Sequence, residues 1–395
     1  MKKIKEKLMY GYLMISGGVT GIIILFIIIF LFSEGIGLFQ SKNIENGYAL
    51  YLNTENVIEE LSPEEITNIF DGKITNWKEV RGQDLEIITY RFNDLLNSYS
   101  ESDLGDNYEH IPLIIEEHIS ENKGIIAYLP TSFAPEESDF VRILSVGNIE
   151  LKDFFIESKW MPTSEPVPLF GSLSLIIGTL LVGFLAIIIA LPLGLGLAVY
   201  LSELANKKVK KVLKPVIELL AGIPSVVYGF FGLIVLAPIV QKVFKLPIGE
   251  TALTGALVLA IMALPTIVSV AEDALNNTPR ELKEASLALG ANQWETIQKV
   301  VFPYAKSGIL AAIVLGVGRA IGETMAVLMV TGNAAILPSS VFQSVRTIPA
   351  TIAAELGEAP TGGVHYQALF LLGIVLFLFT LMTSVVGEVI SKKKY

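Results

Sequence analysis

The sequence has no cysteine, only three histidines and no nucleotide-binding loop. Without cysteine there can be no disulfide, iron–sulfur cluster or thiol chemistry. The histidines, His110, His118 and His365, do not have the spacing of zinc ligands. No Gly-x-x-x-x-Gly-Lys-Ser/Thr stretch is present to cradle the phosphates of ATP. We therefore predict a chain that is not an enzyme and that uses no metal or cofactor.

Charge is also scarce, because only 17% of the residues are charged whereas 52% are hydrophobic. The apolar residues are concentrated in long runs, and about 20 apolar residues in a helix cross the ~30 Å of hydrocarbon in a bilayer. The sequence thus predicts an all-α polytopic membrane protein. We expect six transmembrane helices, at residues 12–32, 172–201, 213–240, 251–270, 307–330 and 366–386.

The first apolar run follows four lysines within residues 1–7, as a secretory signal peptide would. The run is longer than the apolar region of a typical signal peptide, and no small-residue cleavage site follows it. We interpret it as an uncleaved first helix.

The charges divide the chain into regions of opposite sign. Residues 34–168 contain 26 acidic and nine basic residues, a net charge of −17, and the rest of the chain carries +7. A proline-rich stretch at residues 161–168 closes the acidic region. We predict a tail and first helix at 1–33, an acidic extracytoplasmic domain at 34–168 and a transmembrane domain at 169–395.

Lysine and arginine clusters predict the orientation, because cytoplasmic loops are enriched in these residues. The clusters lie between the second and third spans, between the fourth and fifth spans, and at the C-terminus. They comprise Lys207, Lys208, Lys210, Lys211 and Lys214; Arg280, Lys283, Lys299 and Lys306; and Lys392, Lys393 and Lys394. Six spans then place both termini in the cytoplasm and residues 34–168 outside.

The loop at about residues 276–306 predicts two short helices along the cytoplasmic membrane surface. Thr278 is a favourable N-cap, Pro279 suits the first helical position and Glu281 completes a capping box. Gly290 ends this helix. A second helix is expected to begin near Asn292 and to stop before Pro303.

The same loop resembles the coupling signature of bacterial ABC importer permeases. The matching positions are Glu284, Ala285, Ser286, Gly290, Val300 and Pro303, with serine in place of the second alanine of the signature. The resemblance implies that the loop docks into a separate ATPase subunit and transmits its closure to the membrane helices. The alternative is an ordinary amphipathic connector.

The fifth predicted span carries a charged pair within the membrane. Arg319 lies about 18 Å along the helix from Ser307, at roughly 1.5 Å per residue, near the bilayer midplane. A central arginine costs about 2.5–3.5 kcal/mol on insertion scales. Glu323 is one turn further along and in position to pair with it, and Thr324 adds a hydroxyl. The pair is either a structural lock between helices or part of an anion path, since a guanidinium matches phosphate oxygens.

The third predicted span has a weak point at Gly222, Pro224 and Gly229, next to Ser225 and Tyr228. Interrupted backbone is tolerated in a membrane where it lines a cavity. A kink without function is the alternative.

Two segments of the chain are similar to phosphate-specific permeases of the PstC type. These are Arg-Ala-Ile-Gly-Glu-Thr-Met-Ala-Val at residues 319–327 and the glycine-rich stretch at residues 220–232. The resemblance extends from about residue 170 to the C-terminus. It implies a phosphate path formed by Arg319, Glu323, Thr324, Pro224, Ser225 and Tyr228.

The resemblance also implies partners: a homologous PstA-type permease in a heterodimer, two ATP-binding cassette subunits and an extracytoplasmic phosphate-binding protein. The alternatives are a membrane component of a phosphate-sensing complex, a passive anion channel, or an importer of molybdate or sulfate. A coupling loop favours transport over the sensor and the channel, because neither of these needs an ATPase dock.

The acidic region contains three stretches that are similar to the external phosphate-binding protein, at residues 61–77, 87–91 and 124–128. A helix capped by Ser62 and ended by Gly72, followed by short strands, predicts a small α/β unit. The anion-holding Ser-Gly-Thr turn of that protein is replaced by residues 92–98. The negative charge would also repel a dianion. We expect either a degenerate lobe that docks the binding protein or a structural spacer.

Overall fold

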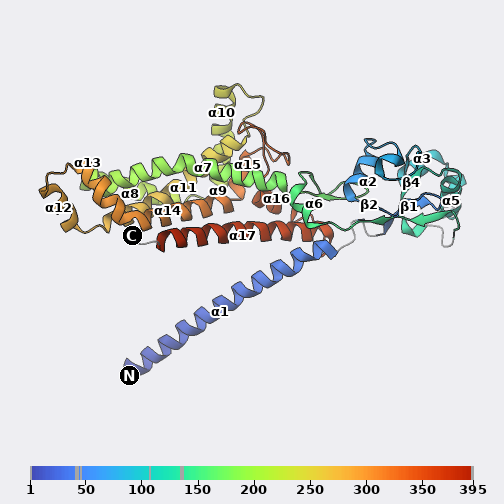
Figure 1. The fold of residues 1–395 in the computed structure, drawn as a ribbon. Helices are drawn as coiled ribbons and strands as arrows, with labels where there is room; N and C mark the ends of the chain where they lie inside the picture. The colour runs from blue at the N-terminus through green and yellow to red at the C-terminus, as the bar shows by residue number, and fades with distance from the viewer. Residues whose placement is uncertain (1, 41–43, 45–46, 106–107, 134–137, 393–395) are drawn as a thin grey trace. The chain divides into compact units, whose positions relative to one another are not determined.

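The computed structural model describes residues 2–40, 44, 47–105, 108–133 and 138–392 (Figure 1). The C-terminal Lys393 and Lys394 of the predicted cytoplasmic cluster lie outside the described residues. The chain separates into two compact units. We call residues 1–35, 172–360 and 369–395 the bundle unit, and residues 36–171 and 361–368 the sheet unit.

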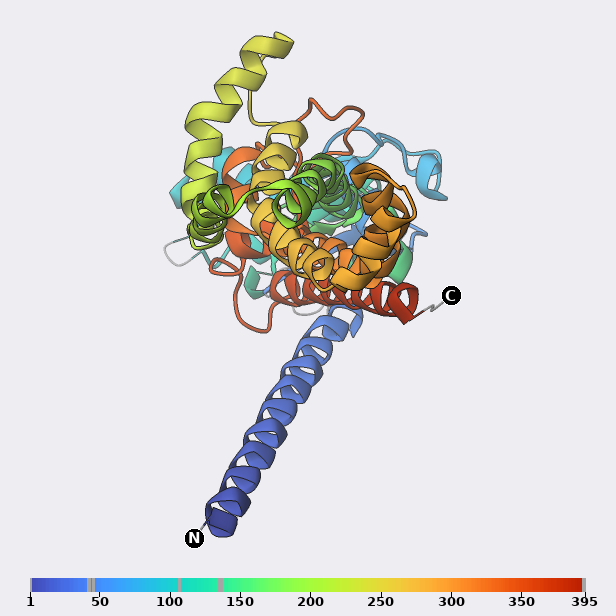
Figure 2. The same ribbon diagram turned by 90° about the vertical axis from the view of Figure 1, so that its left-hand side faces the viewer.

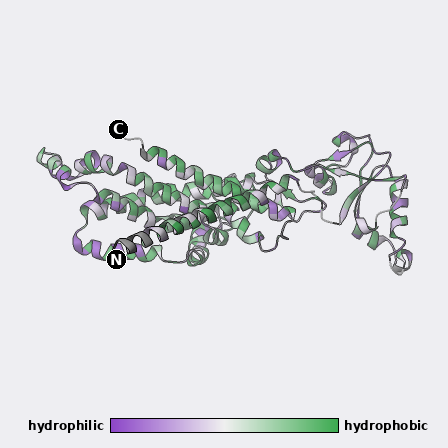
Figure 3. Cartoon of the chain, turned by 90° about the horizontal axis from the view of Figure 1, so that it is seen from below, coloured by the Kyte–Doolittle hydropathy of each residue, from purple (hydrophilic) through white to green (hydrophobic). Residues whose placement is uncertain are grey.

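Six helices among the described residues are long and apolar enough to cross a membrane, which confirms the predicted number of spans. Green, apolar residues dominate these long helices in Figure 3. They are α1 (Lys2–Ile36), α7 (Leu173–Val199), α9 (Ser225–Phe231) with α10 (Ala237–Phe244), α11 (Ala252–Asn276), α14 (Phe302–Gly322) and α17 (Val364–Lys392).

Helix α11 is the centre of the bundle unit and packs closely against α7 and α14. The close approach depends on glycines that face one isoleucine. A Cβ atom added at Gly194 of α7 or at Gly316 of α14 would lie 2.8 Å from side-chain carbons of Ile267. Small residues at helix interfaces let membrane helices pack by direct van der Waals contact. Ile267 therefore fixes the position of α11 between its two neighbours.

The third span begins later than predicted. Residues 207–221 form a separate helix, α8 (Lys207–Ala221), and the membrane-crossing segment starts at Ser225. Gly222 and Pro224 separate the two helices, because proline cannot donate the backbone hydrogen bond that a continuous helix needs. The prediction that residues 213–240 form one span was wrong for its first half.

The fifth span also differs from the prediction at both ends. It ends at Gly322, where Glu323 takes an extended conformation, and a short helix α15 (Met325–Val330) follows. At the other end, α13 (Gln293–Thr296) runs through a π-helical turn at Ile297–Val301 into α14. Pro303 lies in the first turn of α14 and does not stop the helix, because the wider π turn changes the hydrogen-bond pattern before it.

The sheet unit confirms the predicted small α/β insert. Its sheet has the order β3-β4-β1-β5, in which β1 (Tyr48–Asn53) is antiparallel to β4 (Ile125–Pro130) and β5 (Val141–Ile143), and β3 (Ile88–Arg91) is parallel to β4. Alternate residues of β1 and β4 enter two different cores, as the period of a strand requires.

Helices α2 and α5 contribute to different cores of the sheet unit. Helix α2 (Pro63–Phe70) has Ser62 as its N-cap in a capping box with Glu65, and the left-handed Gly72 follows its end, as predicted. Helix α5 (Ile111–Glu121) packs with the other face of the sheet. The remaining elements are α3 (Phe92–Ser98), α4 (Glu101–Leu104), α6 (Leu151–Ile156), β2 (Glu60–Leu61), β6 (Ser145–Val146), β7 (Trp160–Met161), β8 (Leu169–Phe170), α12 (Arg280–Ala288) and α16 (Ile348–Glu355).

Candidate substrate path and coupling loop

Arg319 lies in the last turn of α14 and is half-buried in the bundle unit. Its Nη1 donates a hydrogen bond of 3.2 Å to Oγ1 of Thr266 on α11. Among the described residues, no carboxylate oxygen lies within 4.0 Å of an Arg319 nitrogen. Within the described residues, the charge is therefore met by the Thr266 hydroxyl and not by a carboxylate.

The predicted ion pair between Arg319 and Glu323 is not formed. The prediction assumed an unbroken helix, but α14 ends at Gly322, so Glu323 does not follow Arg319 by one helical turn. Instead, Oε1 of Glu323 accepts a 3.4 Å hydrogen bond from the backbone N–H of Ala326, at the start of α15. The Thr324 hydroxyl donates to the carbonyl of Gly322 at 3.3 Å. Both side chains thus stabilise the break between the two helices.

Glu323 also lines a narrow crevice in the bundle unit together with Thr179 and Thr347. The Thr179 hydroxyl accepts from the backbone N–H of Ile348 at 2.9 Å, and that of Thr347 accepts from Ala350 at 3.4 Å. These hydroxyl groups join α7 to the start of α16. Glu323 is therefore placed beside polar groups, separately from Arg319.

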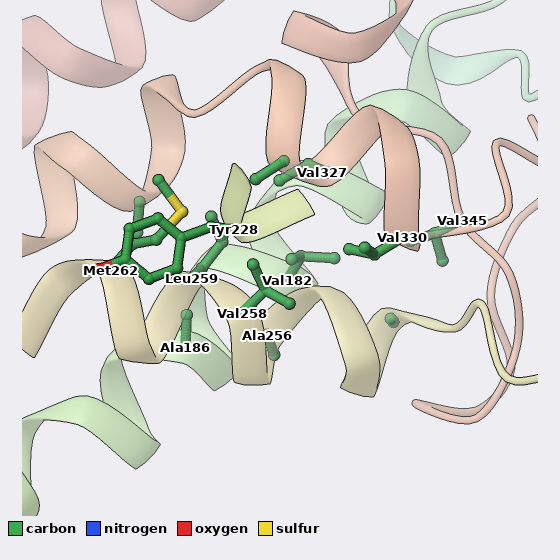
Figure 4. Close-up of a cluster of buried hydrophobic side chains, with 13 residues drawn as sticks. Val182, Ala186, Tyr228, Ala256, Val258, Leu259, Met262, Val327, Val330 and Val345 are labelled. Atoms are coloured by element: carbon green, nitrogen blue, oxygen red, sulfur yellow. The ribbon is translucent and has the colours of Figure 1, made fainter. Parts of the chain in front are cut away.

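Tyr228 connects the two sides of the break in the third span. Its hydroxyl donates a 2.8 Å hydrogen bond to the carbonyl of Leu220, across the interruption at Gly222–Pro224. Its ring is buried in a cluster with Leu259, Met262 and Val327 (Figure 4). Pro224 is exposed and Ser225, the first residue of α9, is half-buried. Of these predicted site residues, Tyr228 thus bonds across the break in the third span.

Thr266 was not among the predicted site residues. It follows Pro265 inside α11, and its hydroxyl accepts from Arg319. The available signal was a hydroxyl residue next to a proline within an apolar span. The sequence gives no means of aligning that position with Arg319, because the helix–helix register depends on packing between α11 and α14.

A second arginine in the bundle unit, Arg346, has a carboxylate partner. Nη1 of Arg346 lies 2.7 Å from Oε1 of Glu355 on α16, and the two side chains are only 20% and 11% exposed. This ion pair was not predicted from the sequence. The pair links the segment before α16 to the C-terminal end of α16.

The predicted coupling loop forms the two helices α12 and α13, but the cap of α12 differs from the prediction. Pro279 is the N-cap residue, and Oγ1 of Thr278 is buried without a hydrogen-bond partner. Thr278 therefore does not form the expected capping box with Glu281. At α13 the expected start at Asn292 is confirmed, since Asn292 and Glu295 form a reciprocal capping box.

Helix α12 is attached to the bundle on one side. Nζ of Lys283 lies 2.6 Å from Oε1 of Glu203, and the side chains are 21% and 11% exposed. The hydroxyl groups of Ser286 and Thr296 lie 3.0 Å apart and join α12 to α13. Gly290 connects the helices at a φ of +91°, a value that L-residues with side chains rarely adopt.

The other side of the loop is exposed and carries apolar residues beside charged ones. No residue of the helix is buried, and Glu284 and Ala285 are both exposed. Leu289 is 89% exposed and Trp294 57% exposed. An exposed apolar patch rimmed by charge is typical of a protein–protein contact. The loop thus has one side fixed to the bundle and one side available to a partner.

Comparisons with known proteins agree with this arrangement. A model of the family described as "Binding-protein-dependent transport system inner membrane component" matches residues 190–394, more than half of the chain. The chain belongs to this family.

The chain matches two curated relatives over most of their own length. The probable ABC transporter permease protein YqgH of Bacillus subtilis is 40% identical over 249 residues, which is 63% of this chain and 80% of that protein. The phosphate transport system permease protein PstC of Mesorhizobium japonicum is 40% identical over 254 residues, 60% of this chain and 76% of that protein. A solved structure of the MetNI methionine ABC transporter is 20% identical with a TM-score of 0.44, covering 54% of this chain and 92% of that chain. The chain is a multi-pass membrane subunit of a transporter, of the PstC type.

One long helix of this permease connects the coupling loop with Arg319. Residues Gln293–Gly322 form a single helical segment of 30 residues. At ~1.5 Å per residue, the part between Gln293 and Arg319 spans about 40 Å. The coupling loop and Arg319 therefore lie on one helical segment.

The sheet unit of the permease lacks a formed anion turn at the predicted place. Residues 92–98 form helix α3, and Oδ2 of Asp94 accepts a 2.8 Å hydrogen bond from the backbone N–H of Arg91. The Arg91 guanidinium lies over the Phe70 ring, 5.4 Å from its centroid. Burial, with Tyr99 and Asp94 acting in the same direction, raises the pKa of Tyr90 to about 12. The Asp94 carboxylate thus occupies the backbone N–H donor of Arg91 itself.

Proposed function

We propose that this permease forms the transmembrane path for inorganic phosphate in an ATP-driven importer. One observation carries the proposal: Arg319 is a cation within the bundle, bound to a hydroxyl and not to a carboxylate. A charge that is costly to place in a membrane and is left without a counter-ion is expected to serve a substrate. The named activity of the PstC relative supports phosphate as that substrate.

The chemistry of the site suits a phosphate dianion. A guanidinium presents forked N–H donors that match two phosphate oxygens, and the Thr266 hydroxyl lies beside it. Phosphate carries a P–OH group near neutral pH, unlike sulfate or molybdate, so a nearby carboxylate could accept a hydrogen bond from that group. Glu323, which is free of an arginine partner, is our candidate for that acceptor. Thr324, Pro224 and Ser225 would complete the path at the two helix breaks.

The coupling loop supports a separate ATPase as the energy source. Glu284, Ala285, Ser286, Gly290 and Pro303 would form or shape the dock, and the exposed patch with Leu289 and Trp294 would enter the ATPase surface. The assembly would contain a homologous PstA-type permease, two ATP-binding cassette subunits and an extracytoplasmic phosphate-binding protein. The family description itself names dependence on a binding protein.

The arrangement of charges supports the predicted orientation in the cell membrane. Helices α8, α12 and α13 lie at one end of the bundle unit, which faces the viewer in Figure 2. These helices and their loops carry the lysine and arginine clusters between spans. We place this end and both termini in the cytoplasm, and the acidic sheet unit outside, where it would orient the phosphate-binding protein.

Phosphate uptake by the reconstituted transporter tests the proposal. The permease, its partner permease and the ATPase are placed in proteoliposomes with the binding protein and radiolabelled phosphate on one side and ATP on the other. We expect ATP-dependent uptake that excess unlabelled phosphate inhibits and that sulfate and molybdate do not. Inhibition by sulfate or molybdate at equal concentration would assign another oxyanion. Phosphate-dependent ATP hydrolysis without uptake would favour the sensing role instead.

A further inference from the structure

A row of lysines on α8 is not used by the proposed transport path. Lys207, Lys210, Lys211 and Lys214 follow the spacing of one helix face and together line one open groove, with Pro215 and Glu218 at its end. We call these four residues the α8 lysine face.

Two of the four lysines attach the helix to the bundle. Nζ of Lys214 lies 3.3 Å from Oε2 of Glu272 and 3.8 Å from Oδ1 of Asp273 on α11. Nζ of Lys210 donates to the carbonyl of Ser202 at 3.1 Å. For Lys207 and Lys211, no carboxylate within 4.0 Å is found in the part of the chain that the structure describes. The groove is thus fixed in place and retains two cationic groups that no described carboxylate neutralises.

The same helix exposes an apolar stripe. Val212 is 64% exposed, Val216 46% and Leu219 72%, and their spacing of four and three residues aligns them along the helix. Ile217 is buried against the bundle. A helix that is too polar to span a membrane, with a lysine face and an exposed apolar stripe, has the properties of a helix that lies in the membrane interface.

We infer that the α8 lysine face binds the phosphate groups of anionic phospholipids. The apolar stripe would enter the acyl chains, and the flexible lysine side chains would extend to the headgroups. Charge complementarity favours this occupant over a neutral lipid. A lipid also accounts for the apolar stripe beside the lysines, which a free phosphate ion does not. The inference does not depend on which substrate the permease transports.

Lipid binding to the full chain provides the test. The purified chain in detergent is incubated with phosphatidylglycerol or phosphatidylcholine, and the bound lipids are counted by native mass spectrometry. We expect more phosphatidylglycerol than phosphatidylcholine on the native chain, and loss of at least half of the bound phosphatidylglycerol in the Lys207→Gln/Lys211→Gln variant. Lys207→Arg/Lys211→Arg should retain it, since the charge is kept. Lys242→Gln/Lys245→Gln, which removes two exposed lysines elsewhere, is the matched control and should bind as the native chain does.

Three results would overturn the inference. One is equal phosphatidylglycerol binding by the native chain and the Lys207→Gln/Lys211→Gln variant. Another is displacement of the lipid by millimolar inorganic phosphate, which would make the groove a site for the free ion. The third is a variant that binds lipid normally but no longer co-purifies with the ATPase, which would make the face a protein dock.

Discussion

The surroundings of Arg319 and Arg346 show two different ways of placing an arginine in the bundle unit. Arg346 lies 2.7 Å from the Glu355 carboxylate, and both side chains are largely shielded. Arg319 is bound to the Thr266 hydroxyl at 3.2 Å and has no carboxylate within 4.0 Å among the described residues. The nearest acidic residue along its own chain segment, Glu323, bonds to a backbone amide.

The difference separates a structural charge from a candidate functional one. In a shielded pair the two charges compensate each other, and removing one member leaves the other uncompensated. A cation held only by neutral groups keeps its attraction for an incoming anion. We therefore propose that Arg346 serves stability and Arg319 the substrate, and each role can be tested separately.

The largest effect is expected from Arg319→Ala. Phosphate uptake should fall by about 10- to 100-fold, because a hydrogen bond to a charged group is worth ~1.5–3 kcal/mol. Thermal stability and co-purification with the ATPase should be unchanged, since no ion pair is broken. Arg319→Lys keeps the charge but not the forked donors. Its phosphate uptake should lie between that of the native chain and that of Arg319→Ala. Near-normal uptake by Arg319→Ala would contradict the proposal that Arg319 serves the substrate.

Glu355→Ala should have the opposite pattern. Leaving Arg346 buried without its partner should destabilise the bundle by about 3–5 kcal/mol. The melting temperature of the detergent-solubilised chain measures this effect, and the double variant Arg346→Met/Glu355→Leu should recover much of the loss. A stable Glu355→Ala variant with defective uptake would mean that Arg346, too, serves the substrate.

Gly290→Val leaves both arginines intact and tests the proposed role of the coupling loop in transport. A β-branched residue at φ +91° is strained by about 1–2 kcal/mol, so coupled uptake should fall roughly tenfold. The ratio of ATP hydrolysed to phosphate transported should rise, while phosphate binding stays normal. Gly196→Ala on α7, where the space is open and φ is helical, is the control. An unchanged ratio would speak against the coupling role of the loop.

The smallest effect is expected from Thr266→Val, which removes the hydroxyl that orients Arg319. The half-saturating phosphate concentration should rise by about two- to tenfold, because a neutral hydrogen bond contributes ~0.5–1.5 kcal/mol. Thr266→Ser should restore it. Thr380→Val removes a hydroxyl that bonds only locally on α17 and should have no effect. Equal effects of the valine variants at positions 266 and 380 would contradict a specific role for Thr266.

The elements that depend on composition and local pattern were predicted well from the sequence. Long apolar runs predicted the six spans, and the Ser62 cap and strand patterns predicted the α/β insert. The helix breaks were predicted less well. The weak point at Gly222 and Pro224 was expected inside a span rather than as the start of one, and the fifth span was expected to continue past Gly322 to residue 330.

The candidate site was predicted only in part for the same reason. Arg319 was found because a charge in an apolar run is conspicuous, whereas its partner was wrongly assigned once the helix was assumed to continue past Gly322. Thr266 was missed because its relation to Arg319 depends on how α11 packs against α14. Thr278 was assigned a cap that its buried hydroxyl does not make. Local signals predict elements, and tertiary packing decides which side chains meet.

The charge at position 319 can be tested directly because the chain has no cysteine. Arg319→Cys introduces the only thiol in the permease, which can be modified with a cationic aminoethyl thiosulfonate or a neutral methyl thiosulfonate of related size before uptake is measured. We predict that Arg319→Cys is inactive, that the cationic reagent restores a substantial part of ATP-dependent phosphate uptake, and that the neutral reagent restores none. Equal uptake after the two reagents would contradict the claim that an uncompensated positive charge at this position receives the anion.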